Sequence, residues 1–214
     1  MKQFVIFCIL WFLQCVSGAF AQDNYLFPEF TQAHVYYKNT AISAFVNYNL
    51  FSSDICVLDG NKRRRLENVD KIEYVNIGDK KFIPLNDNVF GEVLVDGNLV
   101  LVMKYSGEIS KTDETVKGIG KMALNKLLDS GEALPSGIRI QRDSSYYFFK
   151  HKSPDKTFYL PGMNVEKATQ SGIKKLFSKH KSEIDLFIKE NGTDFLSFEH
   201  LKRLVEFCEK YTEN

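Results

Sequence analysis

The stretch "VFGEVLVDGNLVLVMKY", residues 89–105, decides the fold. Two runs of mostly apolar, β-branched residues flank Asp96, Gly97 and Asn98. Asp-Gly readily supplies the positive φ angles of a tight turn between antiparallel strands. The stretch therefore predicts a β-hairpin with strands over 89–95 and 99–105.

The same alternation extends upstream of this hairpin to Ala33, with turn residues at short intervals. The candidate strands are "HVYYK" (34–38), "AISAFVNYN" (41–49), "DICVL" (54–58), "IEYVNI" (72–77) and "KFIPL" (81–85). Short strands joined by short turns are typical of antiparallel neighbours, so we expect a meander of about seven strands. Pro84 should lie at a strand end or an edge, because proline cannot donate a ladder hydrogen bond.

Residues 106–145 interrupt this rhythm with several glycines and Pro135. Apolar residues recur at helical spacing between Ile119 and Leu128, which is compatible with a short helix inside a flexible excursion. Strands are expected again at "SYYFFK" (145–150) and "TFYLP" (157–161).

The C-terminal part changes to a helical period. Apolar residues from Ile173 to Ile188 follow the i, i+3, i+4, i+7 template, and Asn191-Gly192 is a typical helix end. A second helix is expected to begin at Ser197, with Leu196 and Leu201 at the spacing of a hydrophobic staple.

The predicted fold is α+β: an antiparallel β-meander, curved or barrel-like, followed by two C-terminal antiparallel helices. We expect one domain over residues 22–214. Its segments are a β-meander over 22–105, a flexible excursion over 106–145, further strands over 146–160 and a helix pair over 171–212.

Residues 1–21 have the composition of a cleaved signal peptide. Lys2 precedes a short apolar run, and Ala19-Phe20-Ala21 fits the small-x-small rule for cleavage after Ala21. The run is shorter than the roughly 20 apolar residues that a spanning helix needs, so no transmembrane segment is expected in the mature chain. Lys2 is the only charged residue removed, which leaves 27 basic against 27 acidic residues. This neutral balance argues against nucleic acid as a partner.

Several short stretches resemble an uncharacterised family of exported proteins from Gram-negative bacteria. They are "YLFPEF" (25–30), "VYYKN" (35–39), "NYNLF" (47–51), "VNIGDKKFIPL" (75–85), "FGEVL" (90–94) and "IKENGTDF" (188–195). The resemblance covers about Tyr25–Tyr105 and Phe158–Tyr211, and the excursion between them departs from it. It implies a periplasmic or cell-surface location and attaches no activity, cofactor or ligand to any residue; the signal peptide itself predicts a periplasmic or secreted protein.

Cys56 and Cys208 are the cysteines that remain after cleavage. They could form a disulfide in an oxidising compartment, or they could be two buried thiols. The sequence leaves both alternatives open.

"KRRRL", residues 62–66, is the strongest local run of charge. On a strand, Arg63 and Arg65 point to one face and Arg64 to the other. The run could form an anion or partner contact, because arginine binds phosphate and carboxylate in bidentate fashion. Alternatively, the run is an edge strand whose positive charges protect the sheet from aggregation, and we favour this interpretation.

The aromatic run Tyr146, Tyr147, Phe148 and Phe149 places rings on both faces of its strand. These rings could line a concave sheet that holds an apolar ligand, or they could be core on both faces. We favour the core interpretation because aromatic faces are usually buried.

No motif predicts catalysis, a metal site or a cofactor. The four histidines, His34, His151, His180 and His200, lack metal-ligand spacing, and there is no G-x-S-x-G.

Three hypotheses about function follow. The first is an exported, non-catalytic binding module that engages an envelope protein or another copy of itself. The second is a carrier of an apolar or small amphiphilic molecule, and the third is an enzyme of unrecognised type.

Overall fold

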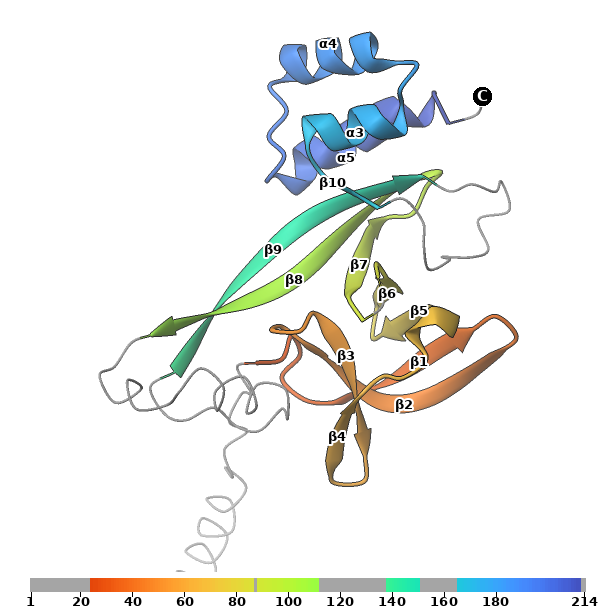
Figure 1. Ribbon diagram of the computed structural model, residues 1–214, viewed down its shortest axis with the longest axis vertical. Coiled ribbons are helices and arrows are strands. Elements are labelled where there is room, and N and C mark those ends of the chain that lie inside the picture. The colour runs from red at the N-terminus through yellow and green to blue at the C-terminus, as the bar shows by residue number, and fades with distance from the viewer. Residues whose placement is uncertain (1–23, 87, 112–137, 151–164, 213–214) are drawn as a thin grey trace, which may run out of the picture.

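A computed structural model describes residues 24–86, 88–111, 138–150 and 165–212 (Figure 1). Within these residues the chain forms one antiparallel sheet followed by helices, which confirms the predicted α+β meander with a curved, unclosed sheet. The strands are β1 Thr31–Tyr37, β2 Thr40–Asn49, β3 Asp54–Asp59, β4 Lys62–Arg65, β5 Ile72–Ile77, β6 Lys80–Pro84, β7 Phe90–Val95, β8 Leu99–Lys111, β9 Ile138–Lys150 and β10 Glu166–Lys167. The helices are the 3₁₀ turn η2 Val69–Lys71 and α3 Gln170–Leu176, α4 Lys181–Asn191 and α5 Phe198–Glu209.

The strands lie in the order β10-β9-β8-β7-β6-β5-β1-β2-β3-β4. Consecutive strands are neighbours except β4 and β5: β4 is an edge strand, and β5 pairs with β1, which therefore lies between β2 and β5. The hairpin predicted from residues 89–105 is β7–β8. The tight turn expected at Asp96-Gly97 is wrong, because neither residue has a positive φ angle. The ladder shifts register near the turn, and the pair next to it is Val95 and Leu101, so the connection is longer than a two-residue turn. The longest ladder joins β8 to β9 from Leu99↔Lys150 to Lys111↔Ile138, and Figure 1 shows this ribbon running from the rolled strands to the helices.

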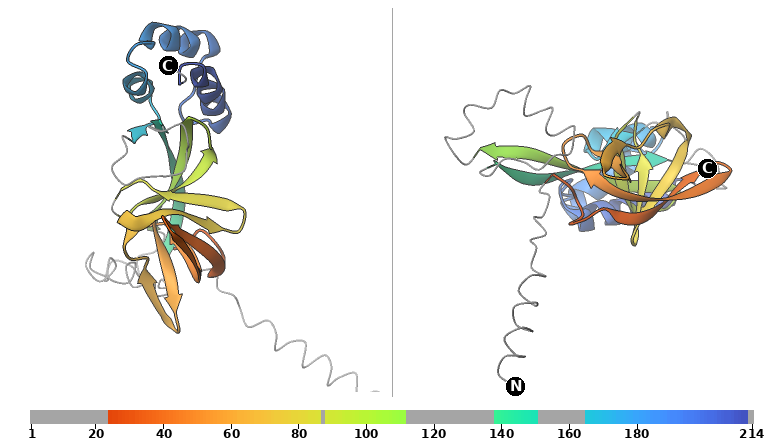
Figure 2. Two further views of the ribbon diagram at one scale, coloured as in Figure 1. Left: turned by 90° about the vertical axis from the view of Figure 1, so that its right-hand side faces the viewer. Right: turned by 90° about the horizontal axis from the view of Figure 1, so that it is seen from below.

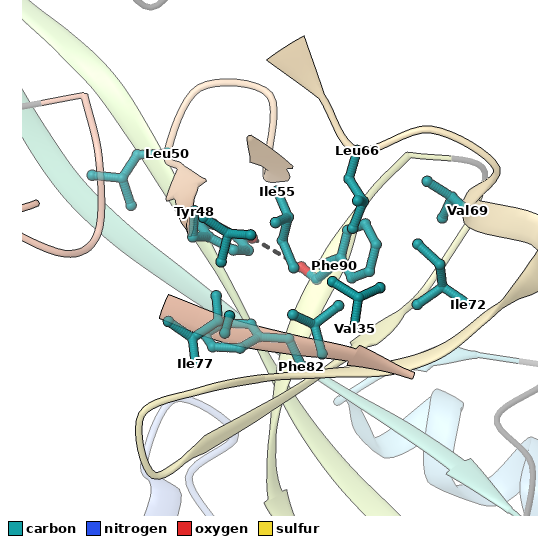
Figure 3. Packing of buried hydrophobic residues seen from close by; sticks show 13 residues of the cluster. Val35, Tyr48, Leu50, Ile55, Leu66, Val69, Ile72, Ile77, Phe82 and Phe90 are labelled. Atoms are coloured by element: carbon teal, nitrogen blue, oxygen red, sulfur yellow. Dashed lines mark hydrogen bonds between the residues drawn. The ribbon is translucent and has the colours of Figure 1, made fainter. Parts of the chain in front are cut away.

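Strands β1–β7 curl into a roll around one apolar core (Figure 3). Alternation places Ala33 and Val35 inward on β1 and Val46 and Tyr48 inward on β2, where all four are buried. The curvature brings separated strands together: the Phe90 N–H donates to the Ser53 carbonyl at 2.8 Å. The hydroxyl of Tyr48 donates to the Phe90 carbonyl at 2.9 Å, the dashed line of Figure 3. These isolated hydrogen bonds connect the two ends of the roll, but they do not form a continuous ladder between strands.

The three helices pack at the opposite end of the molecule from the roll (Figure 2). Their apolar side chains bury Leu99 and Leu101 of β8 and Phe148 of β9. The helices therefore cover one end of the long β8–β9 ribbon.

The single helix expected from Ile173 to Ile188 is wrong, because the structure has two helices there. Phe177 ends α3 with non-helical angles, φ −126° and ψ 59°, and α4 begins only at Lys181. The turn keeps the apolar residues in phase, so Ile173, Phe177 and Ile184 all reach one core. The helical period of apolar residues does not reveal a break between two helices when the apolar residues on both sides of the break stay in phase.

Other local expectations had mixed outcomes. Gly192 has φ 54° and ends α4 as predicted, and Ser197 is the N-cap residue of α5. Pro84 is the last residue of β6, as predicted. The hydrophobic staple is wrong, because Leu196 is 83% exposed and cannot pack on the buried Leu201.

The excursion expected over 106–145 is wrong at both ends. Residues 106–111 belong to β8 and 138–145 belong to β9, because the hairpin register continues through a stretch whose polar composition hides it. Residues 112–137, including the expected short helix, and the expected strand at 157–161 lie outside the described residues.

The predicted signal peptide also lies outside the described residues. In the part of the chain that the structure describes, no helix is long and apolar enough to cross a membrane.

Candidate functional site

The outer face of the roll is divided into a covered half and an open half. Segment 24–30 lies over β2 and β3, where Leu26 N–H donates to the Tyr48 carbonyl and Leu50 N–H donates to the Asn24 carbonyl, both at 2.9 Å. Under this segment, Asn47 and Cys56 are buried although they point outward. No described segment covers the strands β1 and β5 in this way, and among the described residues their outward side chains are exposed or half-buried.

We call the open half the aromatic face. Strand pairing places its members on one side: Gln32 lies opposite Phe45, His34 opposite Ser43 and Asn76, and Tyr36 opposite Ala41 and Tyr74. The aromatic face therefore consists of Gln32, His34, Tyr36, Ala41, Ser43, Phe45, Tyr74 and Asn76. Phe45 is the most conspicuous member, because its side chain is 53% exposed.

A row of stacked groups crosses the aromatic face from strand to strand. The rings of Tyr36 and Tyr74 stack with centroids 4.3 Å apart and planes 20° apart. The Lys81 Nζ lies 4.9 Å from the Tyr74 centroid, and the His34 ring lies 6.4 Å from Tyr36 on the other side. His34 Nδ1 is also within 3.1 Å of the Ser43 hydroxyl. These contacts hold half-exposed rings in fixed positions, which lowers the entropy that binding would cost.

The aromatic face offers apolar area and neutral hydrogen-bonding groups. None of its eight side chains is an acid, a lysine or an arginine, and Lys81 at its border pairs with Asp96 at 2.9 Å. Burial, then the neighbouring Tyr36 and Glu73, raises the pKa of Tyr74, so this phenol stays a protonated donor. A core rich in aromatic groups and poor in charge is the composition that distinguishes the centre of protein–protein interfaces.

The arginine run is β4, the last strand in the sheet order, where the edge-strand interpretation places it. Each guanidinium has partners within the chain. Arg65 Nε lies 2.8 Å from the buried Asp54 carboxylate, and Arg64 lies 3.5 Å from Asp59. Arg63 lies over the Tyr25 and Phe30 rings, at 5.7 and 5.6 Å. The three arginines thus lie together on one strand, but their guanidinium groups interact with acidic and aromatic residues of the chain itself.

The aromatic strand β9 is packed on both faces. Phe148 lies in the helix-covered core, whereas Phe149 packs on the other face with Ile83, Val100 and Val102. Tyr146 is half-buried beside the helix-covered core, and Tyr147 is half-buried on the opposite face. The structure therefore divides these four rings between two faces and does not gather them around one space.

Cys56 and Cys208 are both free and buried, so the disulfide that the sequence left open is absent. The reason is their location: Cys56 lies on β3 under segment 24–30, and Cys208 lies in the core under the helices. Burial raises the pKa of each thiol to about 12. At Cys56 the Asp54 carboxylate raises it further, whereas at Cys208 the Lys210 ammonium lowers it and the Glu209 carboxylate raises it by less. Thiols held protonated in this way are poor nucleophiles.

A second polar cluster lies where β7 and β8 leave the roll. The buried Glu92 carboxylate pairs with Lys80 Nζ at 2.7 Å and accepts a short hydrogen bond from the Tyr105 hydroxyl. Burial and then this hydrogen bond raise the pKa of Tyr105. The Tyr105 carbonyl in turn accepts from Tyr48 at 3.1 Å and from Ser53 at 2.9 Å. These groups satisfy one another, which is the pattern of a structural network.

The described histidines have separate surroundings. His34 lies on the aromatic face, His180 stacks on Tyr211 at 4.1 Å, and His200 Nδ1 accepts from the Asp194 N–H at 3.0 Å. His151 lies outside the described residues. Across the residues described by the structure, no three His, Cys, Asp or Glu side chains gather closely enough to hold a metal ion.

No family model, curated protein or solved structure matches the chain. The candidate site therefore rests on the chain's own geometry.

The sequence analysis missed the aromatic face. His34 and Tyr36 alternate with buried residues on one strand, and Tyr74 and Asn76 do so on another. That alternation was a signal, but it could not show that β1 would lie between β2 and β5 and bring the two tyrosines together.

Proposed function

We propose that the chain is an exported, non-catalytic binding module of the cell envelope, and that it engages a protein partner through the aromatic face. The observation that carries the proposal is Phe45, a large apolar side chain that is 53% exposed beside a fixed row of half-exposed rings. Aromatic anchors of this kind supply most of the energy of protein interfaces. Export rests on the signal-peptide composition of residues 1–21 and on the family resemblance of the sequence.

The geometry supports binding more than catalysis. The titratable groups whose pKa values shift most, among them Cys56, Cys208 and Tyr105, are shifted upward mainly by burial. An upward shift keeps thiols and phenols protonated, whereas a nucleophile or base needs the ionised form.

The test is co-purification of tagged full-length chain from cross-linked envelopes of its own cell. The variant F45A removes the exposed ring, and L196A is the matched control, because Leu196 is equally apolar and more exposed but lies beside the helices. Loss of an interface anchor costs about 2 kcal/mol, or roughly thirtyfold in Kd. A partner recovered with the natural chain and with L196A, but depleted with F45A, is expected. Equal recovery with all three chains would contradict the proposal.

The carrier hypothesis has less support from the packing, because Phe148 and Phe149 are both buried against protein side chains. Native mass spectrometry of the mature chain separates the two hypotheses. We expect the bare mass of the chain, whereas a discrete extra mass that solvent removes would favour the carrier.

A further inference from the structure

The helices α3, α4 and α5 form a cap on one end of the sheet (Figure 1). The cap core contains Leu99, Leu101, Phe148, Ala168, Ile173, Phe177, Ile184, Leu201, Leu204, Val205 and Cys208. None of these residues belongs to the buried core of the roll. A third cluster, Ile83, Val100, Val102 and Phe149, packs on the other face of the β8–β9 ribbon and contains no helix residue. Parts of a fold that have separate cores can open independently of one another.

One side chain fastens the cap to the sheet at the β7–β8 turn. Glu209, the last residue of α5, accepts a hydrogen bond from the Leu99 N–H at 3.0 Å on Oε1. Its Oε2 accepts from the Asn98 side-chain amide at 3.2 Å, and the Thr212 hydroxyl donates to the Glu209 backbone carbonyl at 2.7 Å. Residues more than a hundred positions apart are thus joined through a single carboxylate.

The turn is shaped to receive this carboxylate. A Cβ at residue 97 would overlap Glu209 Oε1, so only glycine leaves room for this oxygen in its observed position. Leu99, whose N–H faces the carboxylate, is itself fully buried in the cap core. Hydrogen bonds to an ionised acceptor are roughly twice as strong as those between neutral groups. The contact therefore couples the end of α5 to the first residue of β8.

We propose that the cap opens from the sheet as a unit while the roll stays folded, and that the Glu209 carboxylate is the latch that holds the cap closed. Opening would uncover the apolar strip of Leu99, Leu101 and Phe148. The inference concerns the cap alone and does not depend on the aromatic face.

The two cysteines report separately on the two parts. Cys208 is buried in the cap core and Cys56 is buried on β3 of the roll. Both have a pKa of about 12, so in the folded chain both are protonated, and labelling requires each site to open. A change at Cys208 alone reports cap opening, whereas a change at both reports unfolding of the whole domain.

The experiment measures the labelling rates of both thiols in the mature chain at pH 8, with a thiol reagent and peptide mass spectrometry. E209Q keeps the size of the side chain and removes its charge. Because the Glu209 carboxylate also raises the pKa of Cys208, each labelling rate is divided by the rate of the same thiol in the urea-unfolded variant. E206Q makes the same change on an exposed residue of α5. N98A removes one donor to the latch and serves if E209Q does not fold.

We expect E209Q to raise the Cys208 labelling rate about tenfold and to leave the Cys56 labelling rate unchanged. A tenfold change corresponds to the loss of about one charge-assisted hydrogen bond. N98A should raise it less, and E206Q should leave both rates as they are. An unchanged Cys208 rate in E209Q, or a parallel rise of both thiols in E209Q or N98A, would overturn the proposal.

Discussion

Asn47 uses both polar atoms of its side-chain amide to hold segment 24–30 on the roll. Its Oδ1 accepts from the Phe27 N–H at 3.1 Å and from the Tyr48 N–H at 2.8 Å. Its Nδ2 donates to the Phe27 and Glu29 carbonyls, both at 2.9 Å. Because Asn47 is buried, each of these bonds is needed to satisfy groups that water cannot reach. One residue thus decides which half of the outer face is covered.

We predict that N47D lowers the free energy of unfolding by about 2–3 kcal/mol, because a second oxygen would face the two carbonyls that the amide now binds. N39D is the matched control, since Asn39 is exposed in the β1–β2 turn. Urea unfolding followed by circular dichroism measures both. Equal stability of N47D and N39D would contradict this role.

The buried thiols predict a loss of stability at high pH. Cys56 and Cys208 have a folded pKa of about 12 against an ordinary 9.0, so the unfolded chain releases their protons first as the pH rises. Their contribution to stability is complete below pH 9 and is lost as the pH rises from 9 to 12. Between pH 8 and pH 10 we expect a loss of roughly 1.4 kcal/mol per thiol.

The measurement is urea unfolding at pH 8 and at pH 10 for the natural chain and for the double variant C56A/C208A. The variant should lose less stability between the two pH values, and the difference should be about 3 kcal/mol. Identical losses for both chains would show that the thiols do not titrate as the structure implies.

At the scale of elements, the β8–β9 ribbon determines the arrangement of the molecule. The cap packs on the end of the ribbon that contains Leu99 and Leu101. The other end, residues 106–111 of β8, contacts the roll, where the Gly107 N–H donates to the Leu50 carbonyl at 2.8 Å. The β7–β8 hairpin could be predicted because Asp96-Gly97 is a strong local signal. The lower part of β8 could not, since residues 106–111 carry polar groups and owe their strand conformation to pairing with β9. Likewise, the break between α3 and α4 depends on tertiary packing.

We predict that G107A destabilises the chain by about 1–3 kcal/mol. A Cβ at this position would lie 2.7 Å from Ile140 Cγ2 and 3.1 Å from Leu50 Cβ, so Ile140 and Leu50, or β8 itself, would have to move. Replacing an unhindered strand glycine with alanine should instead raise the stability of the protein. S106A, on the neighbouring residue, is the control. Urea unfolding gives the sign, and a stabilised G107A would contradict the close approach.

At the scale of the whole molecule, a roll and a helical cap lie at opposite ends of one sheet (Figure 2). The fold class followed from local patterns, because strands and helices each have a characteristic period. The candidate site did not, because it depends on which strands become neighbours. Tyr36 and Tyr74 are far apart in sequence and meet only because β1 pairs with β5.

The most direct test of the proposed function is site-specific photo-cross-linking of the full-length chain in its own cell. A photoreactive phenylalanine analogue replaces Phe45 in one experiment and Leu196 in another, and the adducts are identified by mass spectrometry. We predict one discrete protein adduct from position 45 and none of that identity from position 196. The absence of any adduct at position 45, or the same adduct from both positions, would contradict the assignment of the aromatic face as the binding surface.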